Sequence, residues 1–263
     1  MKFKFTLLSL LFSATGFSQN ISTEAPSVSA SAVTVPQGFL QAELSAGFGI
    51  DNDGTGTIIQ SSEAPYLLLR YGWKDRLEFR LQNRTTFDRI NNVNQYRYQQ
   101  LAIGAKYAIL PNDSKTNLAL IVDISPYAGS WHAQQGVATL AFSSVLGNNS
   151  SIGANLGYSN FNSRFESGNA AFSAQSLLGS VVYSYSFFNR LTAFGEFFYS
   201  YSKSNFGNGV LILMGDSYGV DFGLQFLLRE HIQLDWASGF SLTNKEQFHS
   251  LGFNIYFDTN KKK

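Results

Sequence analysis

The chain has 263 residues, with 19 lysine and arginine residues, 18 aspartate and glutamate residues and no cysteine. The absence of cysteine excludes disulfides, thiolate metal sites and cysteine nucleophiles, and the near-zero net charge argues against a nucleic-acid-binding protein, which should be markedly basic. Aromatic residues make up 15% of the chain and charged residues only 14%, and this low charge disfavours disorder.

The first residues have the pattern of a secretory signal peptide. A basic start at residues 1–4 is followed by an almost wholly apolar run from Phe5 to Phe12 and by small residues up to Ser18. The apolar run is shorter than the about 20 residues that a membrane-spanning helix needs. The alternative is a buried N-terminal strand or helix. We expect residues 1–18 to be a cleaved signal peptide that directs the chain into the export pathway.

Residues 19–34 are rich in serine, alanine and threonine and show no hydrophobic period. We interpret them as a flexible periplasmic lead and expect the folded part to begin near Val35. At the other end, residues 258–263 include three consecutive lysines and are expected to be a solvated basic tail.

Apolar and polar residues alternate with a period of two from residue 38 onwards. Leu77, Phe79 and Leu81, for example, alternate with Glu78 and Arg80. This spacing is typical of strands rather than helices. Most segments reach the about nine to eleven residues of a tilted membrane-spanning strand, whereas strands in soluble sheets average about five or six. The pattern predicts twelve strands, near residues 38–48, 65–72, 76–86, 96–109, 117–127, 136–146, 150–160, 174–187, 191–201, 216–228, 231–241 and 248–257.

The connections between the predicted strands alternate between short and long. Segments 73–75 and 229–230 are short, whereas 49–64 and 202–215 are long. Outer-membrane barrels have short periplasmic turns and longer extracellular loops, and a sheet that spans a bilayer must close so that every backbone polar group is paired. We expect residues 35–257 to form an all-β, transmembrane, antiparallel up-and-down β-barrel of about 12 strands in a Gram-negative outer membrane, with both termini periplasmic.

Several charged residues have the parity opposite to that of the apolar, lipid-facing residues. An arginine or lysine that faces lipid at the midplane costs about 2–4 kcal/mol, so we expect these charges to line the lumen. They either fill a narrow barrel as an ion-pair lattice or select an anionic or polar solute. The predicted lumen-lining residues are Arg70, Arg76, Glu78, Arg80, Arg84, Lys106, Glu43, Asp123, Glu196, Asp221 and Asp235.

Aromatic residues gather near the predicted strand ends. There they are expected to form girdles at the two membrane interfaces, or alternatively a platform for a carbohydrate or aromatic ligand. These residues are Tyr66, Tyr71, Trp73, Tyr107, Tyr127, Trp131, Tyr158, Tyr199, Tyr201, Tyr256 and Phe257.

Enzymatic chemistry finds little support in the sequence. The three histidines, His132, His231 and His249, lie in or near connections, and their spacing assembles no Ser/His/Asp set. No phosphate-binding loop or metal-ligand cluster is present as a sequence motif. We therefore predict no enzymatic activity, no catalytic residue, no metal and no cofactor.

Three segments resemble one family. They are residues 35–43 (VPQGFLQAE), 68–80 (LLRYGWKDRLEFR) and 220–235, of which the second is the most distinctive. The family is the outer-membrane transporter group named for the meta-pathway of phenol degradation, and the resemblance covers roughly residues 35–257. It implies a monomeric barrel of about a dozen strands that passes small, including hydrophobic, molecules. In the hairpin itself, Arg70 and Arg76 flank the turn and could clamp the periplasmic mouth through Glu78 or Asp235.

Three functions remain open at this point. The first is a channel or facilitator for a small solute, the second is a structural or surface-interaction barrel with a plugged lumen, and the third is an outer-membrane enzyme that modifies lipid. The expected partners are outer-membrane lipid, the barrel assembly machinery, periplasmic chaperones and an unknown small solute, and no nucleic acid.

Overall fold

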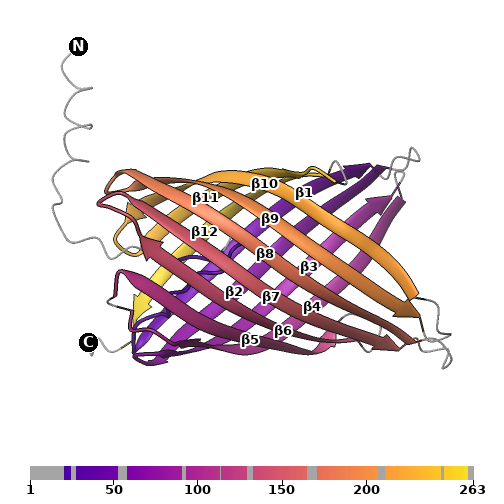
Figure 1. Ribbon diagram of the computed structural model, residues 1–263, viewed down its shortest axis with the longest axis horizontal. Helices are drawn as coiled ribbons and strands as arrows, with labels where there is room; N and C mark the ends of the chain where they lie inside the picture. The colour runs from indigo at the N-terminus through magenta and orange to yellow at the C-terminus, as the bar shows by residue number, and fades with distance from the viewer. Residues whose placement is uncertain are drawn as a thin grey trace, which may run out of the picture.

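A computed structural model gives the chain as twelve long strands that wind around one axis (Figure 1). It describes residues 21–24, 28–52, 58–90, 93–112, 114–128, 133–164, 171–206, 211–243 and 246–259. The strands are β1 (Phe39–Asn52), β2 (Ile58–Lys74), β3 (Leu77–Ile90), β4 (Val93–Ala108), β5 (Thr116–Ala128), β6 (Ala133–Val145), β7 (Ser150–Arg164), β8 (Ala171–Phe188), β9 (Leu191–Phe206), β10 (Leu211–Arg229), β11 (Ile232–Ser241) and β12 (Gln247–Asp258).

The strands form a closed barrel in which each strand pairs antiparallel with its neighbours in sequence. The first and last strands close it, with Phe39 opposite Asp258 and Ile50 opposite Gln247. Closure leaves no unpaired sheet edge, which is the condition for a sheet that spans a bilayer. The predicted fold class and the number of strands are confirmed.

Most strands extend further than predicted at the end of the barrel that carries the long connections. The predicted connection 49–64 is mostly strand, because β1 runs to Asn52 and β2 starts at Ile58. Polar residues form many of the extra rungs, as where Ser61 lies opposite Asp88 and Gln60 opposite Arg89. The ladder continues through them because main-chain pairing does not require apolar side chains once the strands leave the bilayer.

The outside of the barrel is apolar and the inside is polar. Along β4, Leu101 and Ile103 are 49% and 56% exposed, whereas Ala102 and Lys106 between and beyond them are buried. Trp73, Tyr71, Tyr107 and Phe257 are exposed near the strand ends, as expected of interfacial girdles. Tyr158 and Tyr199 are also exposed, but they lie in the middle of β7 and β9. Two other predicted girdle residues face inward, because Tyr66 lines lumenal cavities and Tyr256 is 7% exposed and stacks on Phe39. The side chains of Tyr127 and Trp131 lie outside the described residues.

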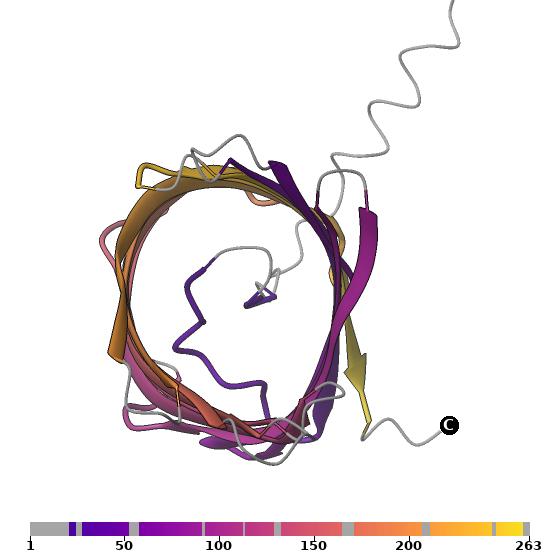
Figure 2. The same cartoon turned by 90° about the vertical axis from the view of Figure 1, so that its right-hand side faces the viewer.

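The predicted flexible lead lies instead inside the barrel. Figure 2, a view along the barrel, shows the start of the described chain running through the lumen. Ala32, Thr34 and Val35 are 1–2% exposed there. We call residues 21–24 and 28–36 the lumen segment. The expectation of a periplasmic lead at 19–34 is therefore corrected for these residues: their small side chains fit a confined lumen, and wall side chains take up their main-chain polar groups.

No helix in the described ranges is long and apolar enough to cross a membrane. Residues 1–18 and 260–263 lie outside those ranges, so the signal peptide and most of the basic tail stay predictions.

Candidate functional site: the occupied lumen

Arg70 is the centre of a buried ion-pair cluster on the wall formed by β1–β4. Its side chain is 0% exposed, and its Nε and Nη1 atoms lie 2.7 Å from Glu78 Oε1 and 3.0 Å from Glu43 Oε1. It also donates to the carbonyls of Ser22 and Val33, at 2.6 and 3.0 Å. The Arg70 guanidinium therefore links β1, β2 and β3 to both parts of the lumen segment, residues 21–24 and 28–36. Its planar fork of N–H donors suits arginine to this role.

Glu24 carries the lumen segment's own charge into this cluster. Its carboxylate accepts from Arg80 Nη1 at 2.7 Å and Nη2 at 2.6 Å, and from the Lys106 ammonium. Burial raises the pKa of Glu24, but the positive charges of Arg80, Lys106 and Arg70 outweigh it and hold this pKa well below its ordinary value. Glu24 is therefore an anionic latch between the lumen segment and the wall.

Further hydrogen bonds hold the middle of the lumen segment and its end next to β1. On the opposite wall, Glu196 accepts from the Val28 N–H at 3.0 Å and from the Ser29 hydroxyl, which also lies 2.7 Å from the Ser180 hydroxyl. Near the strand turns, the Val35 N–H donates to Glu78 at 2.9 Å. The lumen segment is thus bound to both sides of the barrel.

The charges of the two walls are unequal. On the β1–β5 side, three buried cations (Arg70, Arg80 and Lys106) face the wall carboxylates Glu43, Glu78 and Asp123 and Glu24 of the lumen segment. On the β9–β11 side lie Glu196, Asp221 and Asp235, and within the described ranges none of these three makes an ion pair. By formal charge, the described lumen wall therefore has more acidic than basic groups, which gives no support to the anion-selective lining considered from sequence.

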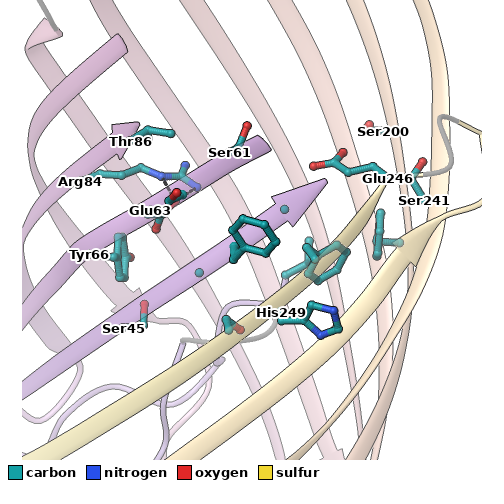
Figure 3. A pocket seen from close by; sticks show the side chains of 18 of the residues that line it. Ser45, Ser61, Glu63, Tyr66, Arg84, Thr86, Ser200, Ser241, Glu246 and His249 are labelled. Carbon is teal, nitrogen blue, oxygen red and sulfur yellow. Dashed lines mark hydrogen bonds and ion pairs between the residues drawn. The ribbon is translucent and has the colours of Figure 1, made fainter. Parts of the chain in front are cut away.

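An open vestibule of about 690 Å³ lies above the lumen segment (Figure 3). Glu24 and Val28 form part of its lining, and the strands contribute mainly serine, glutamine and aromatic side chains. Arg84 pairs with Glu63 at its edge, where the Arg84 side chain is 53% exposed. Burial and the nearby Asp51 raise the pKa of Glu246, which lies in the connection before β12. The vestibule is polar, with its one described cation neutralised by a partner.

Two cavities of about 360 and 330 Å³ lie against the other side of the lumen segment. The larger is lined by residues 21–23 and 29–33 together with β5–β11, and the smaller mainly by Ile21, Val33 to Pro36, Gln41 and Arg70. The lumen segment therefore stands between the vestibule and the space next to the short turns.

Ten of the eleven residues predicted to line the lumen have side chains that face it or its vestibule. The exception is Arg76, which lies in the turn before β3 and is exposed, because β3 begins one residue later at Leu77. In the proposed clamp, Arg70 contacts Glu78, and no contact joins it to Asp235 in the described structure. Asp235 instead accepts hydrogen bonds from Gln233 and Asn254.

The histidines do not assemble a site. His231 lies in the turn between β10 and β11, and His249 is exposed on β12, while His132 lies outside the described residues. In the described part of the chain, no three histidine, aspartate or glutamate side chains are placed to hold a metal ion.

Sequence reasoning missed Glu24, Ser29 and the inward-facing aromatic residues of β9 and β12. Glu24 left one signal, since it is the only charged residue between Lys4 and Glu43. The aromatic residues were detectable by parity, because Phe194 and Phe198 share the face of Glu196.

Solved structures with the same architecture are outer-membrane barrels. The COG4313 outer membrane channel from Pseudomonas putida F1 superposes with a TM-score of 0.71 at 13% identity, covering 90% of this chain and 100% of that one. The NanC porin gives 0.53 at 12% identity, with 81% and 98% covered. The KdgM porin in complex with oligogalacturonate gives 0.51 at 10% identity, with 82% and 99% covered. At these identities the similarity shows the fold.

No curated protein matches the chain by sequence. A family model does match, over residues 23–257, and the match begins within the lumen segment rather than at β1. It confirms the resemblance drawn from the hairpin at 68–80. The chain belongs to the family described as "Putative MetA-pathway of phenol degradation".

Proposed function

We propose that the protein is an outer-membrane channel whose conduction pathway is closed by its own lumen segment. The observation that carries this proposal is the position of the lumen segment between the vestibule and the two inner cavities. It closes the barrel mainly through polar and ionic contacts with the wall, which water can replace when the segment leaves. A purely structural plug would gain more from an apolar core.

The barrel size and the comparisons support the same proposal. Twelve strands leave more lumen than the side-chain-filled barrels of eight strands, and here part of that lumen is occupied by main chain. Solved structures of the same fold include one outer membrane channel and two porins. The acidic excess of the lumen favours cations and neutral solutes over anions.

Removing the lumen segment tests the proposal against the alternative of a structural barrel. In a variant lacking residues 19–34, we expect a steady ionic current in a planar bilayer that is at least tenfold larger than that of the native mature protein. A deletion variant that folds, as judged by the mobility difference between heated and unheated samples in a detergent gel, yet carries no more current than the native protein would support the structural barrel.

A reversible cross-link provides the converse measurement. The Ser29 and Ser180 hydroxyl oxygens are 2.7 Å apart and the chain has no cysteine, so the pair Ser29→Cys and Ser180→Cys places two thiols where a disulfide can form without competing thiols. We expect oxidation to abolish the current and reduction to restore it. Each single cysteine variant is the control, and its current should not respond to the redox conditions.

A further inference from the structure

Asp221 on β10 is a buried carboxylate that lacks a hydrogen-bond partner. The residue is 3% exposed, and neither side-chain oxygen has a partner within the described structure. The other two acids on this wall differ, because Glu196 accepts from the lumen segment and Asp235 accepts from Gln233 and Asn254. A buried carboxylate without a partner is costly, and this cost is removed either by a proton or by a cation bound beside it.

Three phenylalanine rings lie beside the glycines that surround Asp221 on β10 and β11. Asp221 lies between Gly219 and Gly223 on the inner face of β10. The missing side chains of these glycines leave room for two rings: a Cβ at Gly219 would be 2.4 Å from Phe198 Cζ, and one at Gly223 would be 2.5 Å from Phe194 Cζ. One ring therefore lies over Gly219 and another over Gly223, the two neighbours of Asp221 on the inner face of β10.

The third ring comes from the other side of the same carboxylate. A Cβ at Gly239 on β11 would lie 2.5 Å from Phe248 Cζ and also 2.5 Å from Asp221 Cβ. Two atoms that each lie 2.5 Å from one point are at most 5.0 Å apart, so the end of the Phe248 ring lies within 5.0 Å of the Asp221 Cβ. The Phe198 and Phe248 rings are themselves neighbours, with centroids 6.1 Å apart and planes inclined at 52°.

Two of the three rings border the vestibule. Phe198 and Phe248 are both part of the vestibule lining, together with the hydroxyls of Ser217 and Ser241. Asp221 is not part of this lining, so a ligand from the vestibule reaches its carboxylate only if side chains between them move. Glu196, the residue opposite Asp221 on β9, adds a second carboxylate at the same level.

We propose that Asp221, Phe194, Phe198 and Phe248 form a binding site for an organic ammonium ion that enters from the vestibule. Aromatic faces attract a cation through their quadrupoles and suit a methylated or alkyl ammonium group, which sheds water easily. The carboxylate supplies the formal counter-charge. Phenylalanine offers no ligand atom to a metal ion, which requires several oxygen donors at close range, so this set of residues selects the organic cation.

Calorimetric titration of the purified barrel with choline tests the proposal. The uncharged isostere 3,3-dimethyl-1-butanol, which replaces the quaternary nitrogen with carbon, measures shape and apolar contact alone. We expect choline to bind at least tenfold more tightly than this isostere. We also expect Asp221→Asn to weaken choline binding at least tenfold, whereas Asp235→Asn, a buried lumenal acid with its own partners, should change it less than twofold.

A second variant separates the aromatic contribution from charge alone. Phe248→Leu keeps an apolar side chain and the counter-charge but removes a ring face, so choline binding should weaken about threefold or more, while binding of the neutral isostere should change less. The proposal is overturned if choline binds no better than the isostere, if Asp221→Asn binds choline as well as the native protein, or if potassium competes with choline at equal concentration. Binding at equilibrium requires no conduction, so a barrel that carries no current would leave this result intact.

Discussion

The latch formed by Glu24 offers the most direct perturbation of closure. Glu24→Gln removes one negative charge and leaves an amide of nearly the same shape, so the Arg80 and Lys106 side chains lose their shared counter-ion. Breaking a buried ion pair costs about 3–5 kcal/mol. Arg80 keeps Asp123 at 3.1 Å and Glu78 at 3.4 Å, and Lys106 keeps Glu78 at 3.9 Å, which places the loss at the lower end, at about 3 kcal/mol.

This loss translates into a large change in the closed population. At about 1.4 kcal/mol per factor of ten, the ratio of open to closed lumen rises about 100-fold. Single-channel recording measures the ratio as the fraction of time spent in the conducting state. Glu63→Gln is the matched control, because its partner Arg84 is half-exposed and a surface ion pair is worth only about 0–1 kcal/mol, or less than about sixfold.

The reasoning fails on one clear result. If Glu24→Gln has an open fraction within twofold of the native protein, while deletion of residues 19–34 opens the barrel, then the carboxylate does not hold the lumen segment in place and its ion pairs contribute nothing net to closure.

Two further predictions concern pH and the lipid-facing surface. The pKa of Glu24 lies well below the ordinary value of 4.5, so the contribution of the Glu24 carboxylate to closure is complete above pH 4.5 and is lost as the pH falls through the lowered value. Conductance recorded from pH 7 down to 3 should therefore rise only below about pH 4.5. The same titration of Glu24→Gln should show a smaller rise. Ile103→Arg, at a side chain 56% exposed on the outer face, should lower the free energy of unfolding in lipid vesicles by about 2–4 kcal/mol, with Ile103→Leu as the control.

The strands could be predicted from sequence because each strand has one face toward lipid and the other toward the lumen. Leu77, Phe79 and Leu81 alternate with Glu78 and Arg80. In the structure the three apolar side chains lie on the outer face of the barrel, and the two charged side chains lie inside it. Parity also locates inward charges, whatever their partners.

The contents of the lumen were not predictable in the same way. Residues 21–24 and 28–36 form no regular element, so no period marks them, and their contacts depend on which wall groups lie beside each side chain. Arg76 illustrates a limit at the strand ends, where an uncertainty of one residue moves a side chain from the inner face into the turn. The unpartnered state of Asp221 is invisible to parity, because it depends on where Glu196 and the rings find their own partners.

The lumen segment is covalently continuous with β1, and the join is short. Gly38 N–H donates to the Gly72 carbonyl at 2.8 Å and Phe39 N–H donates to the Pro36 carbonyl at 3.1 Å, so the chain is fixed to the wall immediately after the segment ends. A tether this short keeps an undocked segment at an effective concentration on the order of millimolar beside its own binding surface. Closure is therefore first order, independent of how many barrels the membrane holds, and a soluble competitor would have to approach millimolar concentration to keep the barrel open.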